Sequence, residues 1–238
     1  MRKALRNTLI ITGALMVSVT ASFFIYCGIY SHADDWALSF IDGSETVEVT
    51  RNGKDYIFTP TTETSTRFIF YPGGKVEDKA YAPLCSKLAQ NGIETVLVHV
   101  PFNLAFFKID AAKQYMSDES LHYYLGGHSL GGVAASYFAE GRDDIEGMIY
   151  MGSYSPVDLS KKTFNTLAIT ATCDKVMNWD KYNDGKSLLP NLKEVSIEGG
   201  NHGQFGSYGK QSGDGEATIS KEEQTEQVVT AITSFINK

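Results

Sequence analysis

Cysteine is scarce in this chain of 238 residues, which has only three cysteines and five histidines. The cysteines form no Cys-x-x-Cys pair, and no cluster of cysteine and histidine has the spacing of a metal site. With so few cysteines, a chain of this length must depend on a hydrophobic core rather than on a disulfide scaffold. We therefore expect no metal and no cofactor.

Charged residues are absent from residues 7–33, and Arg2, Lys3 and Arg6 precede that stretch. Within it, residues 9–30 form an apolar run of 22 residues, long enough to cross a bilayer as a helix. The preceding positive charges predict a cytoplasmic N-terminus and export of the rest. We expect residues 1–33 to hold a transmembrane signal-anchor and residues 34–238 to form one globular, extracytoplasmic domain, held at the cell membrane by a single span.

A cleaved signal peptide is the alternative for this N-terminal segment. Ser31-His32-Ala33 has the small-x-small pattern of a cleavage site. Cleavage near Ala33 would give a secreted protein. The apolar run is longer than the roughly 7–15 residues typical of a signal peptide, and this length favours the anchor.

Basic residues are outnumbered in the rest of the chain. All 28 acidic residues but only 18 of the 21 basic residues follow residue 33, which gives this part a formal charge of −10. An acidic surface disfavours binding to nucleic acid and to anionic lipid headgroups. We expect no nucleic-acid partner, and no pattern indicates an oligomeric state.

Apolar runs alternate with helical patterns along residues 46–236. Asn52-Gly53 marks a hairpin turn between the first two predicted strands. The predicted strands are residues 46–50, 55–59, 67–71, 94–100, 122–127, 146–151, 167–172 and 192–197, and the predicted helices are residues 78–91, 130–140, 179–188 and 221–236. This order predicts an α/β fold with a mostly parallel sheet, an N-terminal antiparallel hairpin and helices on both faces. In such sheets ligands bind beyond the carboxyl ends of the strands.

The segment Gly127-His128-Ser129-Leu130-Gly131 contains Gly-x-Ser-x-Gly between a predicted strand and a predicted helix. A sharp turn there needs glycine on both sides of the serine, and it would expose the Ser129 hydroxyl above the sheet. It would also put the Leu130 N–H at a helix N-terminus, where partial positive charge stabilises an oxyanion. Ser129 is therefore the candidate nucleophile.

A serine nucleophile needs a base and a carboxylate that orients the base. His202 lies in a glycine-rich loop after the last predicted strand, and Asp174 follows the strand before it. Both positions are carboxyl ends of strands, so the two side chains can reach Ser129. The chain order Ser129, Asp174, His202 is the order expected for this kind of sheet.

Two further groups complete the predicted site. Tyr71-Pro72-Gly73-Gly74 follows a predicted strand, and we expect the Gly74 N–H to join that of Leu130 as an oxyanion donor, with Lys75 as a weaker alternative. Phe102 and Asn103 follow the next strand and are candidates for a substrate pocket. Packing in the core or in a lid is an equally good interpretation of this segment.

The chain resembles the α/β-hydrolase superfamily through these motifs, from about residue 46 to residue 236. Tyr71-Pro72-Gly73-Gly74, Gly127-His128-Ser129-Leu130-Gly131-Gly132, Asp174 and Asn201-His202-Gly203 are most similar to compact bacterial hydrolases related to dienelactone hydrolases, and within these to a membrane-anchored group of the abhydrolase fold-5 type. Dienelactone hydrolases use a cysteine where this chain has Ser129, so their substrate class is not carried over. Only 14 residues separate Gly152 from Leu167, too few for a large cap domain.

The resemblance and the three candidate residues predict a serine hydrolase that cleaves carboxylic esters, either small molecules or components of the cell envelope. An envelope acyltransferase or peptidase with the same triad is an alternative. A catalytically silent binding module at the membrane is another, because a fold does not determine an activity.

Overall fold

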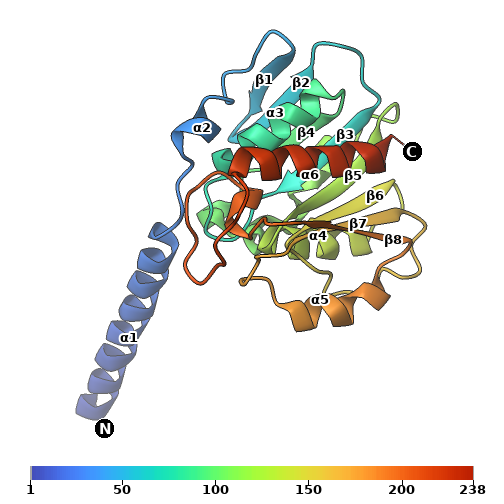
Figure 1. Ribbon diagram of the computed structural model, residues 1–238. Helices are drawn as coiled ribbons and strands as arrows, with labels where there is room; N and C mark the ends of the chain where they lie inside the picture. Colours follow the sequence, from blue (N-terminus) through green and yellow to red (C-terminus); the bar gives the residue numbers. More distant parts are fainter. Residues whose placement is uncertain (1, 238) are drawn as a thin grey trace. The chain divides into compact units, whose positions relative to one another are not determined.

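The computed structural model describes residues 2–237, without the side chains of Arg2 and Ala4, and the chain divides into two compact units, Met1–Tyr30 and Ser31–Lys238. The first unit is one helix, α1 (Arg2–Gly28), at the blue end of the ribbon in Figure 1. Its segment Leu5–Gly28 is long and apolar enough to cross a membrane. By length and composition this segment fits a transmembrane anchor or a signal sequence.

The second unit contains a mixed sheet of eight strands in the order β1-β2-β4-β3-β5-β6-β7-β8. The strands are β1 (Val47–Asn52), β2 (Asp55–Pro60), β3 (Thr66–Tyr71), β4 (Glu94–Leu97), β5 (His122–His128), β6 (Gly147–Met151), β7 (Asn165–Ala171) and β8 (Leu192–Ile197). From β4 to β8 all neighbours pair in parallel, and β2 pairs antiparallel with both β1 and β4. The predicted α/β fold with an N-terminal antiparallel hairpin is confirmed.

The strand order reverses at β3, which lies between β4 and β5 although it precedes both in the chain. A reversal of this kind leaves a crevice at the carboxyl ends of the strands on either side, since the connections leave in opposite directions. The loop after β3 and the turn after β5 therefore meet at one edge of the sheet. Both of these segments carry candidate site residues.

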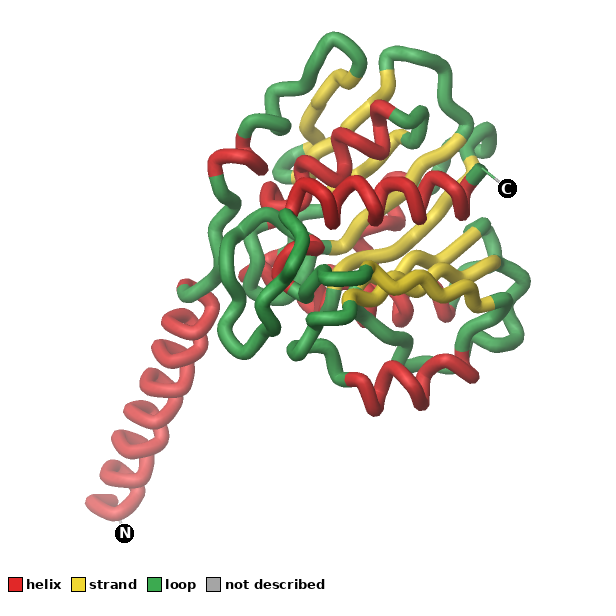
Figure 2. The backbone as a smooth tube through the Cα atoms, viewed as in Figure 1, coloured by secondary structure: helices red, strands yellow, loops and turns green. Residues whose placement is uncertain are grey.

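Helices cover both faces of the sheet (Figure 1). The α-helices of this unit are α2 (Asp35–Leu38), α3 (Ala82–Gln90), α4 (Leu130–Glu140), α5 (Trp179–Gly185) and α6 (Lys221–Ile236). The 3-10 segments are η1 (Asp78–Tyr81), η2 (Pro101–Asn103), η3 (Ala105–Tyr115), η4 (Lys186–Leu188) and η5 (Gly203–Phe205). In Figure 2 the red helices α3 and α6 lie side by side over one face of the yellow sheet.

Alternation along the strands divides the core into two apolar clusters, one on each face of the sheet. Phe68 and Phe70 pack in the cluster that includes residues of α3 and α6. Ile69 and Tyr71, between and after them, pack in the cluster that includes residues of α4 and η3. Because both clusters are buried, the strands read in the sequence as continuous apolar runs.

Several element boundaries differ from the prediction for identifiable reasons. The strand predicted over residues 94–100 ends at Leu97, where pairing with β2 stops, and the His99 N–H donates to the Asp55 side chain at 2.7 Å instead of to a strand. The helix predicted over residues 78–91 is divided into η1 and α3, with Pro83 in the first turn of α3. Proline has no N–H to continue an earlier helix, so an α-helix starts there. The 3-10 segment η3 was not predicted, because its sequence has no 3.6-residue apolar period.

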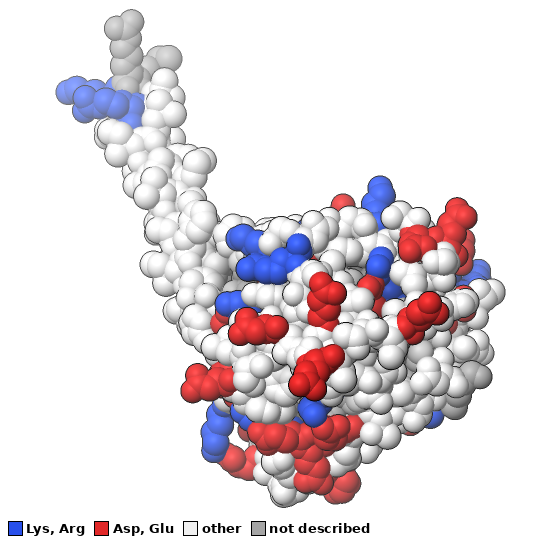
Figure 3. Space-filling view, turned by 90° about the horizontal axis from the view of Figure 1, so that it is seen from above, with Lys and Arg blue, Asp and Glu red and all other residues white. Residues whose placement is uncertain are grey.

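Acidic side chains are spread over the face of this unit that Figure 3 shows from above. Residues 31–34, directly before α2, belong to the unit from Ser31 onward: the Ser31 N–H donates to the Lys75 carbonyl at 2.8 Å, and the Ala33 N–H donates to Glu77 Oε2 at 3.1 Å. The segment that carries the predicted cleavage site is therefore hydrogen-bonded to the loop that follows β3.

Candidate active site

Ser129 stands at the turn between β5 and α4 with φ 50° and ψ −121°. A positive φ is uncommon for a residue with a side chain, and holding it costs on the order of 1–3 kcal/mol. Hydrogen bonds fix it: the Ser129 N–H donates to the Met151 carbonyl at 3.0 Å, and Ser153 Oγ donates to the Ser129 carbonyl at 2.6 Å. The turn therefore has the strained geometry that Gly-x-Ser-x-Gly predicts.

The two glycines of the motif lie where no side chain fits. A Cβ on Gly127 would stand 2.4 Å from the Tyr71 carbonyl oxygen, and one on Gly131 would stand 2.2 Å from the same atom. Real Cβ contacts are never this short, so both positions require hydrogen as the side chain. The turn packs directly against the backbone at the end of β3.

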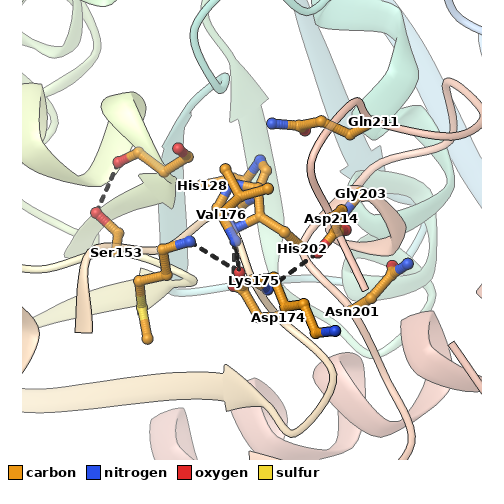
Figure 4. Close-up of polar contacts among 12 residues, drawn as sticks. His128, Ser153, Asp174, Lys175, Val176, Asn201, His202, Gly203, Gln211 and Asp214 are labelled. Carbon is orange, nitrogen blue, oxygen red and sulfur yellow. Dashed lines mark hydrogen bonds and ion pairs between the residues drawn. The ribbon is translucent and has the colours of Figure 1, made fainter. Parts of the chain in front are cut away.

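His202 and Asp174 form a buried pair at the carboxyl ends of β8 and β7. The distance from His202 Nδ1 to Asp174 Oδ2 is 2.7 Å, and the side chains are 2% and 0% exposed. The other carboxylate oxygen of Asp174 accepts from the N–H groups of Val176 at 2.9 Å and Met177 at 2.8 Å. The two carboxylate oxygens of Asp174, which is drawn with Val176 and His202 in Figure 4, therefore have different partners.

Asp214 joins the two loops that carry this pair, and sequence reasoning missed it. Its Oδ2 accepts from the Gly203 N–H at 2.8 Å, and its Oδ1 accepts from the Lys175 N–H at 3.2 Å. In Figure 4 Asp214 lies beside Gly203, on the His202 side of the site. In the sequence, Asp214 lies among glycines and charged residues of both signs, a composition typical of a polar surface loop. Its two backbone partners are apparent only in the folded structure.

Ser129 lies near the His202–Asp174 pair, with Gly152 adjacent to both. A Cβ on Gly152 would be 3.0 Å from His202 Nδ1 and 3.2 Å from Asp174 Oδ2, and Gly152 lines one cavity with Ser129. That cavity has a volume of about 160 Å³. The structure thus brings the three residues singled out in the sequence together at one edge of the sheet.

Gly74 and Leu130 are also neighbours. A Cβ on Gly74 would lie 2.8 Å from Leu130 Cδ2, and Leu130 is the first residue of α4. The loop is fixed one residue later, where the Lys75 N–H donates to the Asn103 carbonyl at 2.7 Å. The amides of Gly74 and Leu130 therefore belong to two segments in direct contact, next to Ser129.

His128, inside the turn, is buried against the pair. Its ring centroid is 4.4 Å from that of His202, and its Nδ1 is 2.8 Å from the Tyr81 hydroxyl, which accepts from the Gly73 N–H at 3.0 Å. The Tyr81 hydroxyl can in addition donate its own proton to Nδ1, in which case the neutral ring carries its proton on Nε2; Nε2 has no hydrogen-bond partner among the described residues. Burial, together with the charge of His202, lowers the pKa of His128 well below its ordinary value.

Phe102 and Asn103 stand in η2, both with positive φ, at 58° and 54°. The Asn103 carbonyl supports the Gly74 loop as described, and Phe102 packs edge-on against Phe107 with centroids 5.4 Å apart. Neither residue is among those that line the cavities next to Ser129. Their assignment to a substrate pocket stays a prediction.

Within the described part of the chain, no group of three or more metal-ligating side chains could hold an ion.

Comparison with known proteins gives a family match over most of this unit. Residues 67–226 match the Alpha/beta hydrolase family. This range includes the turn at Ser129, Asp174 and His202. Among curated proteins, none matches the chain.

Solved structures share the fold at low sequence identity. Est1E from Butyrivibrio proteoclasticus, with bound ferulic acid, is 16% identical with a TM-score of 0.59, over 82% of this chain and 98% of its own. A dienelactone hydrolase from Anabaena variabilis is 16% identical with a TM-score of 0.58, over 80% and 99%. A Pyrobaculum calidifontis esterase is 16% identical with a TM-score of 0.57, over 84% and 89%.

Proposed function

The chain belongs to the alpha/beta hydrolase family, and from this premise we propose that it is a serine hydrolase that cleaves carboxylic esters through an acyl-enzyme. The observation that carries the proposal is the buried His202–Asp174 pair, 2.7 Å apart, at the edge of the sheet where Ser129 stands in a strained turn. A hydrogen-bonded base beside a conformationally constrained serine is the arrangement that activates a hydroxyl.

In the proposed reaction Ser129 Oγ attacks the ester carbonyl while His202 takes the hydroxyl proton. Asp174 accepts from His202 Nδ1–H, which leaves Nε2 to act as the base, and it stabilises the imidazolium that forms. The N–H groups of Leu130 and Gly74 hold the oxyanion. His202 then gives its proton to the leaving alcohol, and a water that it deprotonates releases the acyl group from Ser129.

For the location of the enzyme, we propose that α1 is retained and anchors the domain, with catalysis on the extracytoplasmic side. The helix is long and apolar enough to span a bilayer. Ser31 and Ala33 are also hydrogen-bonded to the domain, so removal of residues up to Ala33 would take away contacts of the folded unit. The size of the N-terminal segment in mature protein from the membrane fraction, measured by mass spectrometry, tests retention.

The test of the proposed function is covalent labelling with a fluorophosphonate probe, which reacts with activated serines. We expect the full chain to be labelled and the Ser129→Ala variant to lose labelling and at least about a thousandfold in ester turnover. Ser160→Ala, an exposed serine in the loop after β6, is the matched control and should be labelled as the wild type. Labelling of Ser129→Ala at the wild-type level would contradict the proposal.

A further inference from the structure

A second, larger cavity opens next to the one at Ser129. Its volume is about 520 Å³, and it shares Leu130, Val133 and Tyr154 with the smaller cavity. Leu130, Val133 and Tyr137 follow one another on one face of α4 at i, i+3 and i+7, and all three line the larger cavity. The hollow therefore runs from Ser129 along the first two turns of α4.

Aromatic rings line this hollow and are only partly covered. Phe106 is 45% exposed and Tyr137 is 41% exposed, and their ring centroids are 6.0 Å apart. Tyr154, from the loop after β6, adds a third ring between the two cavities. Large apolar side chains exposed around a concavity indicate a surface that is covered by a ligand, because their burial is favourable.

The wall of the larger cavity that is formed by α5 contains one cationic and one anionic side chain. Lys181 and Asp184 line the cavity, and Lys181 Nζ lies 5.8 Å from the centroid of the Tyr154 ring. Opposite charges on one wall give it no net charge. A substrate group with a formal charge of either sign would therefore meet repulsion as well as attraction, whereas a neutral group would not.

We propose that this cavity binds the aromatic arm of a neutral ester, with the ring next to Phe106 and Tyr137 and a short linker through the smaller cavity to the carbonyl at Ser129. The inference rests on the proposed function and specifies its substrate class. Rings in this geometry interact favourably edge to face or offset, which gives an aromatic arm an advantage over a saturated one of similar size.

The experiment compares three neutral esters with the full chain in mild detergent. Methyl hydrocinnamate and phenethyl acetate are isomers that carry the phenyl ring on the acyl side and on the alcohol side. Methyl cyclohexylpropanoate replaces the ring of the first with a saturated one. We expect kcat/KM for at least one phenyl ester to exceed that for the cyclohexyl ester by about fivefold or more. The preferred isomer identifies the side of the ester that enters the cavity.

Two matched variants test the cavity itself. Phe106→Ala should lower kcat/KM for the preferred phenyl ester by about tenfold and leave that for ethyl acetate, which carries no ring on either side, within about twofold. Phe107→Ala, the next residue of η3, is 52% exposed and does not line the cavity, so it should match the wild type on all esters.

The outcomes separate this inference from the function on which it rests. Equal rates for phenyl and cyclohexyl esters, or equal effects of Phe106→Ala and Phe107→Ala, overturn the aromatic site while Ser129 labelling and p-nitrophenyl acetate turnover persist. Absence of both labelling and turnover in the wild type overturns the proposed function instead. Because Phe106 is 45% exposed, replacing it with alanine leaves the packing of the core unchanged, and we expect the variant to fold.

Discussion

Two histidine–aspartate pairs among the described residues of the domain have the same separation in different surroundings. His202 Nδ1 lies 2.7 Å from Asp174 Oδ2, and His99 Nδ1 lies 2.7 Å from Asp78 Oδ2. The side chains of the first pair are 2% and 0% exposed, and those of the second are 29% and 9% exposed. The first pair follows β8 and β7, and the second joins the end of the β4 segment to η1.

The contrast shows what a hydrogen-bonded histidine needs before it can act as a base for nucleophilic attack. His99 lines a cavity of about 460 Å³ with Asp55 and Lys108, and the described lining contains no serine, threonine or cysteine. His202 lies beside the turn that presents Ser129. The His–Asp distance is therefore common to both sites, whereas burial and a constrained hydroxyl distinguish the proposed catalytic pair.

The largest expected difference between the pairs comes from neutralising each aspartate. Asp174→Asn should lower kcat by about a thousandfold to ten-thousandfold, since an amide in place of the carboxylate favours the wrong tautomer of His202 and does not stabilise its imidazolium. Asp78→Asn should leave kcat within about twofold. Steady-state hydrolysis of p-nitrophenyl acetate measures both. A comparable loss in Asp78→Asn would show that the second pair also takes part in the reaction.

A smaller effect is expected from a methyl group placed against the catalytic pair. Gly152 has φ +50°, and its Cβ would lie 3.0 Å from His202 Nδ1. Gly152→Ala should lower kcat by about tenfold to a hundredfold, because a displacement of a few tenths of an ångström disturbs the base. Gly53→Ala controls for the backbone, since Gly53 has φ +62° and no atom within 4 Å of its Cβ position.

Thermal unfolding separates the two contributions in these variants. Both should lose on the order of 1–2 kcal/mol of stability from the positive φ. If Gly53→Ala lowers kcat as much as Gly152→Ala does, crowding of the pair is not the cause.

The smallest expected effect concerns the ring of His128, which packs at a tilt against that of His202. The pKa of His128 is lowered by burial and by the charge of His202. Below pH 6.5, therefore, His128 binds a proton in the unfolded chain while it stays neutral in the folded protein. The stability that the neutral ring contributes is complete above pH 6.5 and is lost as the pH falls below it. The slope for one such group is at most about 1.4 kcal/mol per pH unit.

Urea unfolding from about pH 7 to about pH 5 measures this slope. In His128→Asn, whose amide oxygen can accept from Tyr81 in place of Nδ1, the free energy of unfolding should fall less steeply by about 1 kcal/mol per unit. His122→Gln, at a side chain that is 62% exposed, should keep the wild-type slope. Identical slopes in all three proteins would show that His128 takes up a proton in the folded state.

The positions of the candidate site residues could be predicted because these residues stand at recognisable points of a repeated pattern. Ser129 follows a buried strand and precedes a helix, and Asp174 and His202 follow the next-to-last and last strands. In a parallel sheet the carboxyl ends share one edge, so position in the chain implies proximity. The hairpin turn at Gly53, which has φ +62°, was predictable for the local reason that glycine tolerates positive φ.

The remainder depends on contacts between distant segments, which no local pattern encodes. Asp214 reaches the Lys175 N–H, 39 residues away, and it reads in the sequence as a surface acid among glycines. The larger cavity combines Phe106 from η3, Val133 from α4 and Asp184 from α5. The 3-10 backbone of η3 gives no apolar period, so the ring of Phe106 could not be placed on a particular face in advance.

The close approach of Gly131 to the end of β3 has a thermodynamic consequence. A Cβ there would lie 2.2 Å from the Tyr71 carbonyl oxygen and 2.5 Å from that of Pro72, so the two segments that carry the proposed oxyanion donors meet backbone to backbone. No side chain separates the two backbone segments, so the spacing of the donors does not depend on a side-chain rotamer. It is set when the chain folds. Substrate therefore meets amides whose conformational entropy is already lost, and transition-state binding can be favourable without the closure of a loop.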